Sequence, residues 1–195
     1  MKLDQIDTSK NFSKRLLDAF TNGLFDLLKR KQLENITVAE LCNQVNYPRS
    51  TFYNYFEDIY VLMDYCWDTI GNQIKVTNFY EIEHNKRTLA LFDMVYDYMD
   101  ENRMSIDKLL KHNHQDGAMI LSLDRYIKKT IYQMICDCPF SYKYPVPYDI
   151  IAQHYRNTIQ MILSACFIDK SISKKDASAY ITFLLGTLEK ESTRK

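Results

Sequence analysis

Apolar residues recur with helical spacing along most of the chain. The first segment, residues 9–32, has an apolar residue at every fourth position: Phe12, Leu16, Phe20, Leu24 and Leu28. A period near 3.6 residues is typical of an amphipathic helix with one buried face. Gly and Pro, which interrupt helices, occur only four times each. The pattern therefore predicts an all-α protein.

The cleanest local signal opens the second predicted helix, at about residues 37–44. "TVAE", Thr37 to Glu40, fits a capping box, in which Thr37 caps the amide of Glu40 and the Glu40 side chain reaches back. After a short turn, Pro48 is suited to the first position of a third helix that ends near residue 55. Two short helices joined by a tight turn form a helix-turn-helix.

The remaining helices are longer. Asp58 is expected to cap a fourth helix that reaches about residue 76. The periodicity then predicts helices at 86–102, 104–112, 117–137, 148–168 and 174–191. The last of these has an apolar packing face made of Ala177, Ile181, Leu184, Leu185 and Leu188.

The third predicted helix lies in "PRSTFYNYFED", residues 48–58, which contains four aromatic rings. At about 100° per residue, Phe52 and Phe56 share one face and are expected in the core. Tyr53 and Tyr55 flank that face, and we expect their hydroxyls to point outward. The polar residues predicted to be exposed are Arg49, Ser50, Thr51 and Asn54.

A short helix with this exposed surface suits the DNA major groove. Its side chains can contact base edges and phosphate oxygens, and Arg49 is the candidate for a bidentate contact with guanine. The alternative is that these are the solvated polar residues of a small helix bundle. Residues 1–60 carry eight Lys or Arg and eight Asp or Glu. Because phosphate affinity depends on neutralised charges, a dimer would be needed to double the contacts.

The bulk composition narrows the other possibilities. The chain has 195 residues, with 25 Lys plus Arg against 25 Asp plus Glu. No apolar run is long enough to span a membrane and the N-terminus lacks a signal-peptide stretch, so a cytoplasmic protein is expected. Cys42, Cys66 and Cys166 are interpreted as buried small hydrophobes. The cysteine and histidine spacings predict no metal site, and no pattern indicates a cofactor or a catalytic group.

Residues 36–66, "ITVAELCNQVNYPRSTFYNYFEDIYVLMDYC", resemble the DNA-binding signature of TetR-family regulators. The resemblance implies a three-helix DNA-binding head, residues 1–57, and a larger ligand-sensing and dimerisation domain, residues 58–195, with helix 58–76 bridging them. It also implies DNA contacts. Arg49, Ser50 and Thr51 would face bases or phosphates, Tyr53 and Tyr55 would hold the backbone, and Thr37 would offer its helix N-terminus to a phosphate.

The chain departs from that signature at three positions. Pro48 stands where the family often has a small polar cap. Ile59 stands where a phosphate-binding lysine is common, and Glu57 stands where a basic residue is common. The last two changes remove positive charge from the surface expected to meet DNA.

The resemblance favours a homodimeric, ligand-responsive repressor that binds double-stranded DNA at a near-palindromic operator. The last two helices would pair with their copies in the dimer, although packing within one chain explains their apolar faces equally well. A small apolar or aromatic ligand is the candidate partner of the middle helices. The alternative is a TetR-like co-regulator whose C-terminal domain binds a protein partner, and an enzyme is the reading with least support.

Overall fold

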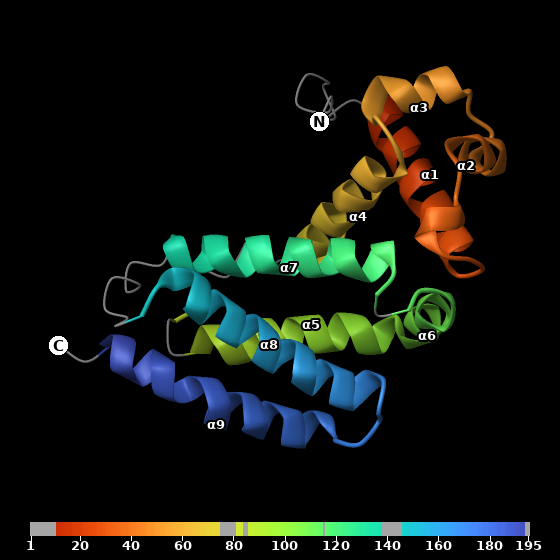
Figure 1. Cartoon of the computed structure of the whole chain (residues 1–195). Helices are drawn as coiled ribbons and strands as arrows, with labels where there is room; N and C mark the ends of the chain where they lie inside the picture. Colours follow the sequence, from red (N-terminus) through yellow and green to blue (C-terminus); the bar gives the residue numbers. More distant parts are fainter. Residues whose placement is uncertain (1–10, 75–80, 84–85, 115, 138–145, 194–195) are drawn as a thin grey trace. The chain divides into compact units, whose positions relative to one another are not determined.

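The computed structural model describes residues 11–74, 81–83, 86–114, 116–137 and 146–193. Within these residues the chain forms nine α-helices and one short 3-10 helix (Figure 1). Every regular element of the described residues is therefore helical, which confirms the all-α prediction.

The helices agree closely with the ranges predicted from periodicity. They are α1 (Asn11–Leu28), η2 (Leu33–Asn35), α2 (Val38–Val45), α3 (Arg49–Tyr55), α4 (Ile59–Gln73), α5 (Arg87–Glu101), α6 (Arg103–His112), α7 (Ala118–Cys136), α8 (Tyr148–Phe167) and α9 (Lys174–Thr193). The largest difference is at the end of the first helix, which we predicted to reach residue 32. It stops at Leu28, and the chain then makes the separate 3-10 turn of η2.

The contacts divide the chain into two compact units. The first comprises Met1–Ile70 and Met104–Asp124, and the second comprises Gly71–Arg103 and Arg125–Lys195. Helix α6 and the start of α7 thus pack with α1 to α4, although they lie far along the sequence. The functional division that we predict after residue 57 is a separate matter and stays a prediction.

The core of the first unit is built around the buried face of α1. Leu16, Phe20, Leu24 and Leu28 are all fully buried, as predicted. Phe12 is an exception, because its side chain is 66% exposed. The prediction is wrong there because Phe12 lies in the first turn of α1, where the neighbouring Ser13 is the buried residue and contacts Tyr55 instead.

Helices α1 and α2 approach closely at Gly23. A Cβ atom on this residue would lie 2.4 Å from Cγ1 of Val45 and 3.1 Å from Cδ1 of Leu41. The Gln44 side chain also donates to the Gly23 carbonyl at 3.1 Å. Only a residue without a side chain lets the two helices pack at this separation.

The ends of α2, α3 and α4 are determined by local hydrogen bonds. Thr37 Oγ1 accepts from the amide of Glu40 at 3.2 Å, as predicted for the cap of α2. The reciprocal half of the capping box is wrong, because the Glu40 carboxylate forms an ion pair with Lys31. Pro48 is the cap residue of α3 rather than its first helical residue. Asp58 caps α4 by accepting from the amide of Val61 at 2.9 Å.

Asn46 terminates α2 in the left-handed region, at φ 57° and ψ 42°. Its backbone amide donates to the last carbonyls of the helix, those of Cys42 and Asn43. This conformation reverses the chain toward α3, and asparagine tolerates it better than most residues with a side chain.

The second unit has its own core, where α5 and α8 pack against α9. Its buried members are Phe92, Ile162, Cys166, Phe167, Ala177, Ile181 and Leu185. Leu184, which we predicted on the packing face of α9, is 38% exposed, because Ile181 and Leu185 point more directly at α8 and α5. The side chain of Leu188 lies outside the described residues.

The three cysteines expected in the core, Cys42, Cys66 and Cys166, are buried. Among the described residues, no helix combines the length and apolarity needed to cross a membrane. Within the same residues, no cluster of three or more His, Cys, Asp or Glu side chains could hold a metal ion.

Candidate nucleic-acid interface

Helix α3 packs against a cluster of buried aromatic rings in the first unit. Phe52 and Phe56 are fully buried, which confirms the inward face predicted for this helix. The Phe52 ring meets Phe20 edge-on, with centroids 5.4 Å apart and an interplanar angle of 86°. Phe56 contacts both Phe20 and Phe52, with centroids 6.4 and 5.5 Å apart. Such offset and edge-to-face contacts add to area burial and hold the short helix in one orientation.

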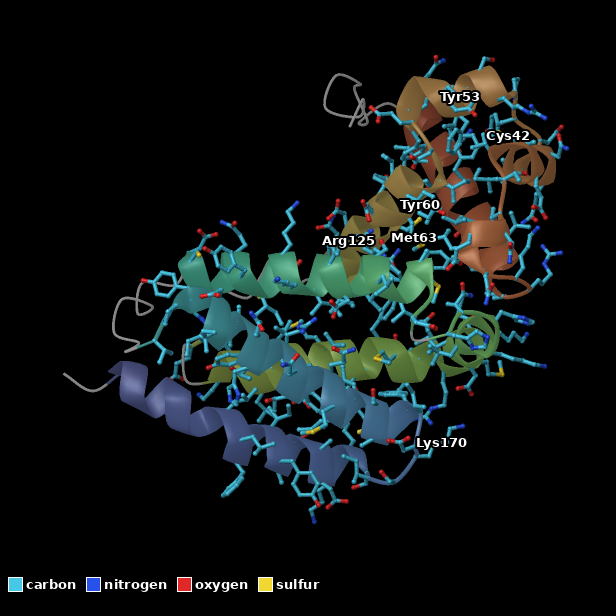
Figure 2. All side chains as sticks on the ribbon, in the orientation of Figure 1. Cys42, Tyr53, Tyr60, Met63, Arg125 and Lys170 are labelled. Atoms are coloured by element: carbon cyan, nitrogen blue, oxygen red, sulfur yellow. The ribbon has the colours of Figure 1, made fainter. Side chains whose placement is uncertain are left out.

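The outer face of α3 is polar and has no carboxylate. Arg49, Ser50, Tyr53 and Asn54 are exposed, and Thr51 is half-buried. Tyr53, labelled on α3 in Figure 2, is 45% exposed. Its ring still contacts the Phe52 ring edge-on, with centroids 5.5 Å apart. Part of the Tyr53 ring is therefore packed while part of its surface is open to solvent, as predicted for a side chain that sets the depth of a helix in a groove.

Tyr55 does not share this exposure. Only 8% of it is accessible, and its hydroxyl donates to Ser13 Oγ on α1 at 3.4 Å. The prediction that this hydroxyl points outward is wrong. Tyr55 lies about 60° from Phe52 around the helix, within the width of an ordinary buried stripe. The first turn of α1 covers that side.

Thr37 is exposed at the N-terminus of α2. Its hydroxyl oxygen already accepts from the Glu40 amide, so the first-turn amides that remain are the groups able to meet an anion. An N-terminus of this kind favours a phosphate through both its N–H groups and its dipole.

Comparison with known proteins gives fold matches only. No known family profile and no curated protein sequence matches the chain. A crystal structure of a candidate TetR-family transcriptional regulator from Syntrophomonas wolfei superposes with a TM-score of 0.67. It is 17% identical, and the match covers 90% of this chain and 95% of that one. The chain has the fold of TetR-family regulators.

A second match is a candidate regulator of fatty acid metabolism from Clostridium perfringens. Its TM-score is 0.56 at 16% identity, and the match covers 86% of this chain and 97% of that one. Both matches extend across nearly the whole of each chain, so the likeness includes the C-terminal helices as well as the helix-turn-helix.

The TetR-like head lacks a cation at the start of α4. Ile59 is only 4% exposed and belongs to the core, so the residue standing where the family often has lysine is turned inward. Glu57 and Asp58, just before it, are exposed. The exposed side chains that lead into α4 are therefore two carboxylates.

Tyr60 is an exposed residue of this region that the sequence reasoning missed. It is 45% exposed in the first turn of α4 (Figure 2). Tyr60 lies about 200° around α4 from the buried Leu62, on the opposite side of the helix. The helical period of α4, with Leu62 and Cys66 on its buried side, was the signal that could have found it.

Proposed function

We propose that the chain is a sequence-specific DNA-binding transcriptional regulator that acts as a homodimer. The observation that carries this proposal is the outer face of α3, which is polar, free of carboxylates and supported by the buried rings of Phe52 and Phe56. A helix held in this way can enter a major groove without losing its orientation. The TetR-like fold supports the same reading.

The proposed contacts divide into those that read sequence and those that hold the backbone. Arg49, exposed at the start of α3, would read guanine through its two donor groups. The Tyr53 hydroxyl would donate to a phosphate. The backbone amides at the N-terminus of α2, beside Thr37, would donate to a second phosphate. The neighbouring polar side chains proposed to complete the surface are Ser50, Thr51 and Asn54. Tyr55 supports the helix from inside.

A homodimer is favoured by both charge and surface. Residues 1–60 carry as many carboxylates as cations, and two heads on one duplex double the phosphate contacts. Helices α8 and α9 expose several large apolar side chains, which are Met161 at 58%, Tyr180 at 47%, Phe183 at 79% and Leu184 at 38%. Large exposed apolar side chains on two helices that pack together favour an interface there.

We further propose repression that a small apolar or aromatic ligand relieves. The same exposed apolar side chains also favour the second candidate function, in which the C-terminal domain binds a partner protein. A ligand would raise the melting temperature of the purified protein in a thermal-shift screen. A protein-binding co-regulator would give no such shift, and a partner would co-purify with it.

The direct test is selection of binding sites from random duplex DNA by the purified protein at low salt. The expected result is an enriched near-palindrome with half-sites about one helical turn apart. Affinity for that site should fall steeply as salt rises, because counterions are released on binding. Selection that enriches no sequence would refute the proposal.

Three variants of α3 separate the proposed roles. Arg49→Ala should relax the preference at particular bases, whereas Tyr53→Phe should weaken binding to all sequences by a similar factor. Tyr55→Phe is the matched control, because it removes the same hydroxyl from a buried ring on the same helix. Its DNA affinity should stay unchanged. A selected sequence that is identical for Arg49→Ala and the parent protein would remove Arg49 from base reading.

A further inference from the structure

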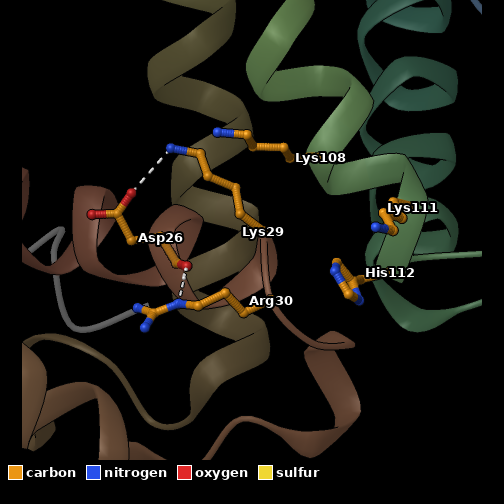
Figure 3. Close-up of a pocket in the computed structure, with 6 residues that line it drawn as sticks. All are labelled: Asp26, Lys29, Arg30, Lys108, Lys111 and His112. Carbon is orange, nitrogen blue, oxygen red and sulfur yellow. Dashed lines mark hydrogen bonds and ion pairs between the residues drawn. The ribbon is translucent and has the colours of Figure 1, made fainter.

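A second surface of the first unit, at the end of α1 opposite to the end that contacts α3, gathers positive charge. A pocket of about 570 Å³ lies between the end of α1 and helix α6. Its lining residues are Asp26, Lys29, Arg30, Lys108, Lys111 and His112 (Figure 3). The end of α1 and helix α6, which are more than seventy residues apart in the sequence, therefore both contribute basic side chains to the pocket.

The lining is strongly cationic in a chain whose net charge is zero. Four cations and one carboxylate leave a net charge of +3 with the histidine neutral. The carboxylate, Asp26, is already paired with Lys29 at 3.0 Å. Arg30 is held by neutral acceptors, because its Nε donates to the Asp26 carbonyl and its Nη2 to Gln44 Oε1, each at 3.0 Å. Positive charge on Arg30 is thus oriented but not neutralised.

Cations are also favoured at helix C-termini, where they interact with the helix dipole. Helix α1 ends at Leu28 and α6 ends at His112, and each end carries about half a negative charge from its dipole. Two such ends contribute about one negative charge, which is too little to balance the side chains. Stabilisation of the helix ends therefore explains part of the cluster and leaves an excess of positive charge.

The two walls are joined by a buried asparagine. Asn113 is 2% exposed, and its Nδ2 donates to the carbonyls of Leu28 at 2.9 Å and Leu109 at 3.0 Å. Its Oδ1 accepts from the amide of Leu33 at 3.2 Å. One side chain thus ties the end of α1 to the end of α6. The backbone of the two walls is thus fixed by Asn113, so a ligand would have to order only the lysine side chains.

We propose that this pocket binds a small polyphosphorylated molecule. Lysine and arginine on opposing walls suit an anion with several charged oxygens, and arginine can contact two of them at once. The volume is within the range of small-molecule sites, about 300–1,000 Å³. Ser13, which touches α3, and Leu28, the last residue of α1 before Lys29, are fifteen residues apart, or about 22 Å along the helix axis. The pocket is therefore distinct from the α3 surface, and the proposal does not depend on DNA binding.

The test is isothermal titration of the full chain with inorganic tripolyphosphate and with ATP at low salt. We expect one site per chain, with affinity that falls as salt rises. The double variant Lys108→Gln/Lys111→Gln should bind about tenfold more weakly, because it loses charge-assisted hydrogen bonds. Asp26→Asn should bind more tightly, because it removes the one carboxylate among the described lining residues and frees Lys29.

The matched control is Lys128→Gln/Lys129→Gln on α7, which removes the same charge from two exposed lysines of the second unit that are not among the lining residues. Its affinity should stay within about twofold of the parent, because exposed charges that do not contact the ligand are screened by salt. Equal losses in both double variants, or citrate binding as tightly as tripolyphosphate, would overturn the proposal. So would displacement of tripolyphosphate by random-sequence duplex DNA, since the pocket would then be a DNA contact. Tighter binding of ATP than of tripolyphosphate, lost in the Lys108/Lys111 variant, would support a nucleoside polyphosphate as the ligand.

Discussion

Replacement of Phe52 by alanine most directly tests the buried aromatic packing that holds α3. The Phe52 side chain is fully buried and contacts the rings of Phe20 and Phe56. Phe52→Ala leaves a ring-sized void between α1 and α3. Alanine is a better helix former than phenylalanine, so any loss of stability must come from packing.

The expected loss can be worked out from the buried area. A phenylalanine buries about 150–250 Å², which at about 25 cal/mol per Å² is worth about 4–6 kcal/mol for the whole side chain. Alanine retains the Cβ, so the loss should be about 3–5 kcal/mol, the usual range for such truncations. With a urea m-value of about 2 kcal/mol/M, the unfolding midpoint should fall by about 2 M.

Trp67 provides the assay, because it is the one tryptophan of the chain and lies in the same unit. It is 7% exposed, its Nε1 donates to Ser122 Oγ at 3.1 Å, and its ring meets Phe25 at 6.2 Å. Unfolding of the first unit should expose this ring to water. Its fluorescence during urea unfolding therefore reports the stability of the unit that contains α3.

Tyr53→Ala is the matched control, since it removes a ring of similar size from the next residue of the same helix. Tyr53 is 45% exposed, so its loss should be about 1 kcal/mol or less. A Phe52→Ala midpoint within about 0.5 M of the parent would refute the assigned inward face. Equal shifts in the two variants would refute it as well.

Three further predictions concern the helix-turn-helix and the core. Gly23→Ala should destabilise the first unit by about 1–3 kcal/mol in the same assay, because its Cβ would lie 2.4 Å from Val45 Cγ1. The double variant Gly23→Ala/Val45→Ala removes that clash and should recover part of the lost stability. Asn46→Ala should reduce stability by about 1 kcal/mol because of the left-handed backbone, whereas Asn46→Gly should stay within about 0.5 kcal/mol. Burial raises the pKa of the Cys66 thiol from 9.0 to about 12, so the unfolded chain loses this proton at lower pH than the folded chain. The thiol should not affect the pH dependence of stability below pH 9 but should lower stability by up to about 1.4 kcal/mol per pH unit above it. In urea unfolding from pH 8 to 11, the stability of Cys66→Ala should therefore decline less steeply with pH than that of the parent. Equal slopes for the two proteins would contradict the buried, protonated thiol.

The sequence by itself determined the helices and much of the helix-turn-helix. The Thr37 cap, the Asp58 cap and the inward direction of Phe52 and Phe56 were all predicted and confirmed. These features depend on the 3.6-residue period and on hydrogen bonds that span three residues, so a local stretch of chain contains the information.

Contacts between distant segments were decided only by the tertiary structure. Tyr55 is buried because the first turn of α1 covers it, and Ile59 is turned inward at a position where a solvent-exposed lysine is common in the family. The cationic pocket and the Asn113 link exist because α6 packs against the end of α1, more than seventy residues away in sequence. Helical periodicity defines a buried face but not which segment covers it. That choice depends on the packing of all the helices together, which no local pattern records.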